Sequence, residues 1–186
     1  MSQSNRGGGH GATVQERHRD AVKRFLKLIM AGTTNREASK AVSLVNRTYY
    51  GECWQACDIA NAITEVADNE RTAGHAGQRF DPYAVYRHLL NEGRFEENYS
   101  LREWVIEVTA SGAGHQVPTT ASLRDLARDI ATSWLRVRCC DYFKDEGVAY
   151  WPLADLLEYA RQANEELQQI ARRLPSIDYL EGTTAA

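Results

Sequence analysis

Cysteine and histidine are the residue types in this chain that could bind a metal ion. Cys53 and Cys57 are four residues apart, which places both thiols on one face of a helix, and His75 or His88 could complete a site. Structural zinc sites usually take their ligands from C-x-x-C pairs, and the sequence contains no second pair. Buried cysteines in a helical core are the commoner outcome. The sequence therefore predicts no metal and no cofactor.

Motifs that carry catalysis do not stand out in the sequence. The stretches RGGGHG and SGAGH lack the strand, helix and Lys-Ser/Thr of a phosphate-binding loop, and neither H-E-x-x-H nor G-x-S-x-G occurs. Carboxylate pairs such as Asp125 and Asp129 alternate with arginines, as on a solvated helix face. The adjacent Cys139 and Cys140 are more typical of core and surface neighbours than of a redox pair. We expect a protein that is not an enzyme and has no small-molecule substrate.

Charge is distributed unevenly along the chain. The first fifty residues contain nine Lys or Arg and three acidic side chains, a net charge of +6, whereas the remainder carries −9 and the whole chain −3. Such a basic segment is expected of a surface that contacts phosphate groups, although a solvated basic helix without a partner gives the same pattern. We expect contacts to the nucleic-acid backbone in this part. The cations assigned to that role are Arg17, Arg19, Lys23, Arg24, Lys27, Lys40 and Arg47.

Aromatic residues interleaved with arginines provide a second set of candidates. Tyr50 lies in an aromatic stretch at the end of the basic segment, and Arg136 and Arg138 lie near aromatic residues of the C-terminal half. Cations and rings together can hold single-stranded nucleic acid by phosphate contact and base stacking. We therefore expect Tyr50, Arg136 and Arg138 to contact nucleic acid. Core packing is expected instead for Trp54 and Trp134.

The stretch over residues 35–54, NREASKAVSLVNRTYYGECW, resembles a helix-turn-helix unit. Ser39 falls where the first helix must approach the second, Ser43 replaces the usual turn glycine, and Tyr49 occupies a buried position. Glu52 departs from the pattern because an apolar residue is usual there. Two consecutive amphipathic helices of a bundle also explain the stretch, and we favour that interpretation over a helix-turn-helix unit. The residues that would face bases or phosphates are Asn46, Arg47, Thr48 and Tyr50.

Hydrophobic periodicity predicts helices along most of the chain. Thr34 with Glu37, and Ser100 with Glu103, have the spacing of capping boxes, and Asp81 precedes a proline suited to the first helical position. The fold class expected is all-α, a compact bundle of about six or seven helices. The expected helices cover residues 13–32, 34–45, 52–68, 82–91, 100–111, 120–146 and 152–174.

Length and composition suit one globular domain. The chain has 186 residues, of which 43% are hydrophobic and 25% charged. We expect a disordered Gly-rich tail over 1–12, a single helical domain over 13–174 and a loose tail over 175–186. Within the domain, basic helices over 13–50 pack on an acidic bundle over 51–174. No membrane-length apolar stretch, signal peptide or disulfide framework is recognisable, so we expect a cytoplasmic protein without membrane contacts.

In size, helical content and charge distribution, the chain resembles the small subunit of multi-subunit CRISPR effector complexes. Those subunits are compact helical proteins without active sites that line the path of guide RNA and target DNA. The resemblance implies a non-catalytic structural subunit of a ribonucleoprotein complex in antiviral defence. It would contact the backbone of RNA or single-stranded DNA through Arg and Lys, while base pairing reads the sequence elsewhere. Other protein subunits, and possible copies of this chain, would be its partners.

Two alternatives remain open. A helix-turn-helix DNA-binding protein, such as a repressor or a phage DNA-packaging recognition subunit, would read duplex DNA through Asn46, Arg47 and Tyr50. A protein-interaction module whose basic helix docks on an acidic partner would not bind nucleic acid at physiological salt. Replacing Arg47 by Ala separates backbone contact from base reading, because only base reading loses discrimination between sites.

Overall fold

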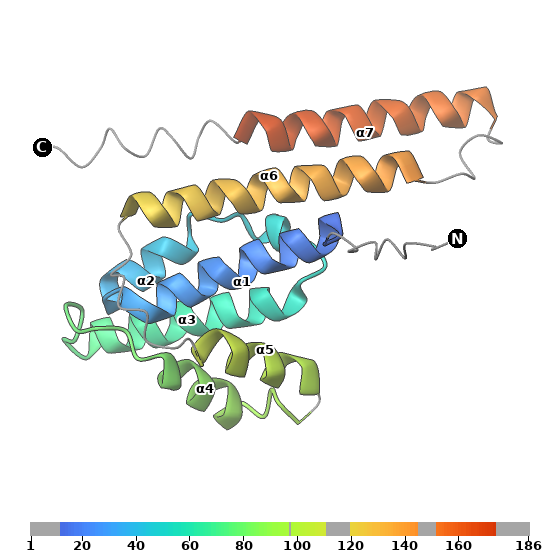
Figure 1. Cartoon of the computed structure of the whole chain (residues 1–186). Coiled ribbons are helices and arrows are strands. Elements are labelled where there is room, and N and C mark those ends of the chain that lie inside the picture. The colour runs from blue at the N-terminus through green and yellow to red at the C-terminus, as the bar shows by residue number, and fades with distance from the viewer. Residues whose placement is uncertain (1–11, 97, 111–119, 145–151, 174–186) are drawn as a thin grey trace, which may run out of the picture.

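The computed structural model describes residues 12–96, 98–110, 120–144 and 152–173 (Figure 1). These residues form seven α-helices, one 3₁₀ helix and no strand, which confirms the all-α prediction. The tails expected over 1–12 and 175–186 lie outside the described residues, apart from residue 12. The elements are α1 (Val14–Gly32), α2 (Asn35–Val42), η1 (Arg47–Tyr50), α3 (Trp54–Thr72), α4 (Pro82–Asn91), α5 (Tyr99–Thr109), α6 (Thr120–Lys144) and α7 (Leu153–Arg173).

Helix α1 lies at the centre of the molecule and packs against α6, α5, α3 and α2 (Figure 1). It begins with a capping box in which Thr13 and Glu16 each satisfy the other's backbone N–H group. Phe25, Leu26 and Ile29 are completely buried on its inner side. Because these apolar positions recur every three or four residues, one face of α1 enters the core while the opposite face keeps its charged side chains in solvent.

The junction between α1 and α2 is tied to the loop that follows α3. Thr34 and Glu37 form the predicted capping box at the start of α2. The buried side chain of Asn35 donates a hydrogen bond from Nδ2 to the carbonyl oxygen of His75 at 2.9 Å. An isolated antiparallel bridge joins Thr34 to Arg79. The polar stretch after α3 is therefore an anchored loop whose backbone groups find partners on α2.

The segment between α2 and α3 differs from the sequence-based expectation. The helix expected over 34–45 ends at Val42, and residues Arg47–Tyr50 form a single 3₁₀ turn capped by Asn46. The side chain of Asn46 accepts a hydrogen bond from the backbone N–H of Thr48 at 3.1 Å. An Asn that caps a turn in this way competes with a continuing α-helix. Where a recognition helix would begin, the chain therefore makes a tight turn.

Helices α3, α4 and α5 cover the side of α1 opposite α6 (Figure 1). Helix α4 begins as predicted, with Asp81 accepting a hydrogen bond from the N–H of Tyr83 and a proline at the first helical position. The predicted capping box of Ser100 and Glu103 is wrong. Helix α5 begins one residue earlier, at Tyr99, so Ser100 already lies inside its first turn.

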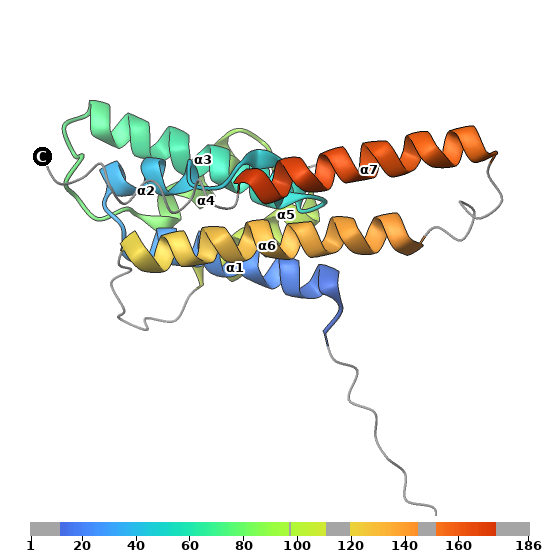
Figure 2. The same ribbon diagram turned by 90° about the horizontal axis from the view of Figure 1, so that it is seen from above.

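Helices α6 and α7 form an antiparallel pair along one side of the other helices (Figures 1 and 2). The end of α6 and the beginning of α7 extend beyond α1 and α5 in both views. Helix α7 contacts mainly α6, and its buried residues include Ala163 and Ile170. Leu153 and Leu157, in its N-terminal half, are exposed. The position of α7 therefore depends on its contacts with α6.

Candidate nucleic-acid interface

Seven basic side chains of α1, α2 and η1 form no ion pair with a carboxylate among the described residues. Arg17, Arg24 and Lys27 come from the outer side of α1. Arg17 instead donates from Nε to the carbonyl oxygen of Ala12 at 3.1 Å. All are exposed except Lys27, which is half-buried. We call this set the N-terminal cations; it consists of Arg17, Arg19, Arg24, Lys27, Arg36, Lys40 and Arg47.

Arg36 was missed as a contact residue by the sequence analysis. It lies four residues before Lys40 on α2, and both side chains are exposed. Side chains four residues apart share one face of a helix, so α2 presents a pair of adjacent cations. The spacing in the sequence was the signal that could have identified Arg36.

One predicted contact residue of α1 has a carboxylate partner within the protein. Lys23 forms an ion pair with Glu107 of α5, and its Nζ atom lies 4.8 Å from the ring centroid of Trp104. Arg19, in contrast, is exposed and forms no ion pair with a carboxylate, although it lies near the thiol of Cys53. Lys23 would have to give up an ion pair to bind a phosphate, which makes it a weaker candidate than the N-terminal cations.

Several arginines from the acidic part of the chain differ from the N-terminal cations because they pair with carboxylates. Arg71 contacts Asp68 within α3, and Arg87 contacts Asp81, at N–O distances of 3.4 Å and 2.9 Å. The arginines of this part that pair with carboxylates are Arg71, Arg87, Arg94, Arg138 and Arg161. Among the described residues, Arg102, Arg136 and Arg172 of the same part form no ion pair with a carboxylate. Paired arginines are therefore more frequent in the acidic part than in the first fifty residues, but unpaired cations occur in both.

The prediction that Tyr50 faces outward is wrong. Its side chain is only 1% exposed, because η1 turns it into the core beside Tyr49. Burial raises the pKa of Tyr50 above its usual range, so its hydroxyl stays neutral. Arg47, on the same 3₁₀ turn, is exposed and keeps its predicted position at the surface.

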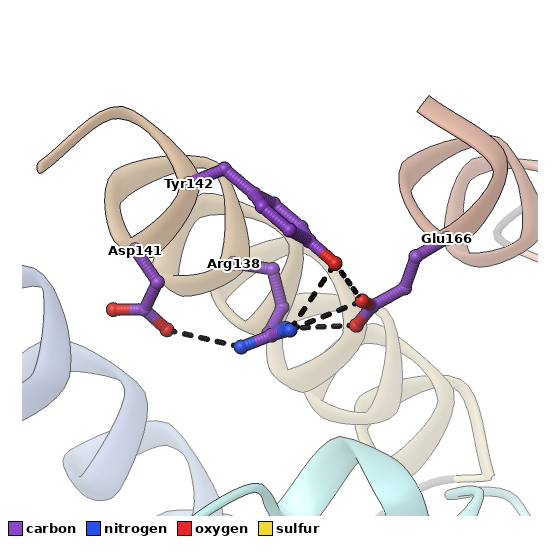
Figure 3. Close-up of polar contacts among 4 residues, drawn as sticks. All are labelled: Arg138, Asp141, Tyr142 and Glu166. Atoms are coloured by element: carbon purple, nitrogen blue, oxygen red, sulfur yellow. Dashed lines mark hydrogen bonds and ion pairs between the residues drawn. The ribbon is translucent and has the colours of Figure 1, made fainter. Parts of the chain in front are cut away.

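Arg138, another predicted contact residue, is bound between α6 and α7 (Figure 3). Its Nε and Nη2 atoms donate to the two carboxylate oxygens of Glu166 on α7 at 2.8 and 3.0 Å. It also contacts Asp141 and the hydroxyl of Tyr142, and this hydroxyl donates a further hydrogen bond to Glu166. The guanidinium lowers the pKa of Glu166, so that carboxylate is ionised at neutral pH. Arg138 therefore joins two helices and is not available to a phosphate.

The structure agrees with some of the remaining predictions for α6 and α3 and differs from others. Arg136 is exposed, as expected of a contact residue. Trp134 is half-buried: the Arg138 guanidinium lies 5.6 Å from its ring centroid, and its ring lies beside His18. The expectation of core packing for Trp54 is wrong, because this residue opens α3 with 42% of its side chain exposed.

A cavity of about 290 Å³ lies where α1, α5, α6 and the start of α3 meet. His18, which lines it, is buried, and its Nδ1 atom lies 2.8 Å from the hydroxyl of Ser133. Burial lowers the pKa of His18 below its usual value, so the ring is neutral at pH 7. Burial also raises the pKa of Cys53 in the same wall, against the opposing effect of Arg19. A protonated thiol is a poor nucleophile, so this cavity lacks an activated cysteine.

Side chains that could hold a metal ion come together away from Cys53 and Cys57, and they include His88. Among the described residues, Cys53 and Cys57 belong to no group of three or more metal-capable side chains. The group that is found consists of Glu65, His88 and Glu92, where α3 and α4 meet.

No family model, curated protein or solved structure matches this chain. In the part of the chain that the structure describes, no helix has the length and apolar character required to cross a membrane.

Proposed function

We propose that this chain binds the phosphate backbone of RNA or single-stranded DNA through its N-terminal cations, as a non-catalytic subunit of a larger ribonucleoprotein assembly. The observation that supports the proposal is the lack of carboxylate partners for these cations among the described residues. Arg136 is exposed on α6 and would extend the same contact area for a nucleic acid that follows that helix.

Physical reasoning favours the unpaired cations as phosphate ligands. A cation that already contacts a carboxylate must exchange one anion for another, and the net gain is small. An unpaired, exposed cation releases condensed counterions from the nucleic acid without losing a protein contact. The net charge of −3 does not oppose this binding mode strongly, because exposed charges more than about 8–10 Å apart are largely screened at physiological salt.

The local structure around Arg47 favours contact with the nucleic-acid backbone over reading of base edges. A recognition helix needs several outward side chains on one α-helix, and the corresponding residues here form a 3₁₀ turn of four residues. Arg47 is exposed on that turn, but Tyr50 is buried. Binding should therefore depend on charge and salt and should vary little with base sequence.

The test is fluorescence-anisotropy binding of the whole chain to labelled single-stranded RNA, single-stranded DNA and random duplex across a salt series. The variant replaces Arg24, Lys40 and Arg47 with glutamine. For a single strand, each lost phosphate contact lowers the slope of log affinity against log salt by about 0.7, so we expect a decrease of about 2.

A matched control removes the same amount of charge elsewhere. It replaces Arg71, Arg87 and Arg161 with glutamine; all three are exposed and contact carboxylates. We expect this triple variant to keep the wild-type salt slope. Equal losses in both triple variants would show that only overall charge matters. No binding at low salt would contradict the proposal, and strong preference for one duplex sequence would instead indicate a DNA-reading protein.

A further inference from the structure

Three side chains that can bind metal ions converge where α3 and α4 lie against each other. Glu65 comes from α3, His88 from the last turn of α4, and Glu92 caps the C-terminus of α4. The Nε2 atom of His88 lies 2.9 Å from Glu65 Oε2 and 3.4 Å from Glu92 Oε1. All three ligand atoms lie within 4.8 Å of one another.

These separations fit the coordination shell of a divalent ion. Metal–ligand bonds of about 2.0–2.1 Å place neighbouring ligand atoms about 2.9 to 3.4 Å apart, from octahedral to tetrahedral geometry. Both distances from His88 Nε2 fall in that interval. The two carboxylates lie at most 4.8 Å apart, and Glu92, whose side chain is exposed, can rotate to shorten that distance.

A small cavity lies over the same three side chains. Its volume is about 90 Å³, and Asp58, Asn61 and Arg94 complete its wall. This is more space than one water molecule needs, so an ion could keep water ligands there. Arg94 donates from Nη2 to Asp58 Oδ2 at 2.6 Å, which compensates the charge of Asp58.

The charge of the cluster also suits a cation. With a neutral imidazole, Glu65 and Glu92 contribute a charge of −2 that a divalent ion would balance, and a metal ligand must be the neutral imidazole. Imidazole nitrogen suits Zn²⁺ and neighbouring transition metals, whereas Mg²⁺ and Ca²⁺ prefer oxygen ligands alone. Residues His88 and Glu92 are four apart, so α4 supplies two ligands from one face.

We propose that Glu65, His88 and Glu92 bind a divalent transition-metal ion, with Zn²⁺ the best match, and that this ion joins α3 to α4. Three protein ligands leave at least one coordination position for water. The site does not depend on the proposed nucleic-acid binding, because its residues are separate from the N-terminal cations.

The test is isothermal titration calorimetry of the whole chain with Zn²⁺, with the number of bound equivalents as the readout. His88→Ala and Glu65→Gln should each bind one equivalent fewer than the wild type. The matched control is His75→Ala, because His75 is an exposed histidine that contacts one carboxylate, Glu70, at 2.8 Å. The control should keep the wild-type stoichiometry, and far-UV circular dichroism checks that each variant is folded.

Co²⁺ supplies a second readout that distinguishes this site from a cysteine site. Ions bound by nitrogen and oxygen ligands give visible d–d bands without the near-ultraviolet sulfur-to-metal charge-transfer band. We expect His88→Ala to lose such d–d absorption. Unchanged stoichiometry in both His88→Ala and Glu65→Gln would overturn the proposal, as would a lost equivalent whose spectrum carries a thiolate band.

Discussion

Gly51 lies against the indole ring of Trp134 so closely that a Cβ atom on residue 51 would be 2.3 Å from the ring carbon Cζ3. The residue also has a φ of +58°, a backbone conformation that L side chains rarely adopt. Both facts come from the turn between η1 and α3, which brings this backbone onto α6. Glycine is therefore required here for space as well as for conformation.

We predict that Gly51→Ala lowers the free energy of unfolding by about 3 kcal/mol. Backbone strain contributes about 1–2 kcal/mol, and displacement of a packed ring costs a further 1–3 kcal/mol. Urea unfolding measures the difference. Gly93→Ala is the control, because Gly93 has a φ of +69° but open space around the position of a Cβ atom. If both variants lost the same stability, the contact with Trp134 would contribute nothing.

The second prediction concerns the ion pair between α6 and α7 (Figure 3). Glu166→Gln should weaken the two hydrogen bonds from Arg138 and loosen α7, at a cost of about 1–2 kcal/mol. Hydrogen exchange should become faster in α7 and stay unchanged in α1. Glu165→Gln serves as the control, because Glu165 pairs with Arg161 within α7 itself. Equal exchange in the two variants would show that the bridge does not hold α7 in place.

The third prediction is a loss of stability between pH 7 and pH 5.5 caused by His18. Burial lowers the pKa of His18 from its ordinary 6.5, so the unfolded chain binds a proton in this range that the folded chain does not. Stability therefore falls as the pH drops below about 6.5, by at most about 1.3 kcal/mol at pH 5.5.

His18→Gln removes this titration and should flatten the dependence of unfolding free energy on pH in that interval. Urea unfolding at several pH values gives the comparison. The ionised carboxylates with lowered pKa values, Glu16, Glu158 and Glu166, lose their contribution only as the pH falls through about 4.5 and below. A wild type and variant with identical slopes between pH 7 and 5.5 would contradict the prediction.

The fourth prediction concerns Asn35 and the loop after α3. Asn35→Ala removes the donor to the carbonyl oxygen of His75 and should cost about 1–2 kcal/mol. Amides over residues 74–80 should then exchange faster, because the loop loses one of its attachments to α2. Gln78→Ala changes an exposed side chain of the same loop and should leave exchange unaltered. Equal exchange rates in the two variants would argue against the anchoring role of Asn35.

Local signals in the sequence predicted the starts of two helices correctly. The capping box of Thr34 and Glu37, and the Asp81–Pro82 pair, each act within a few residues, so the sequence contains all the information needed. The capping box predicted for Ser100 is wrong, because α5 begins one residue earlier, at Tyr99, and has no side-chain cap.

The orientation of the aromatic side chains could not be predicted in the same way. Tyr50 was expected outside and is buried, whereas Trp54 was expected inside and is exposed. The 3₁₀ turn and the new helix beginning at Trp54 change the helical phase, so periodicity from one side of the turn does not continue on the other.

Contacts between distant residues were the least predictable part of the candidate site. Arg138 and Glu166 are on different helices, and their pairing depends on how α7 is placed along α6. The sequence identified Arg138 as a cation near aromatic residues but contained no sign of the carboxylate that binds it. The positive net charge of the first fifty residues was easier to interpret, because cations such as Arg24 and Lys40 are exposed in the folded protein.

The packing of α1 against α6 has a consequence for synthesis of the protein on the ribosome. The most extensive helix contact joins the first helix of the chain to the sixth, which begins at Thr120. At translation rates of about 5–20 residues per second, the apolar face of α1 lacks its main partner for on the order of 5 to 20 seconds. The side of α1 that α6 covers therefore stays exposed in nascent chains during this interval, and chaperones that bind short apolar segments should recognise it.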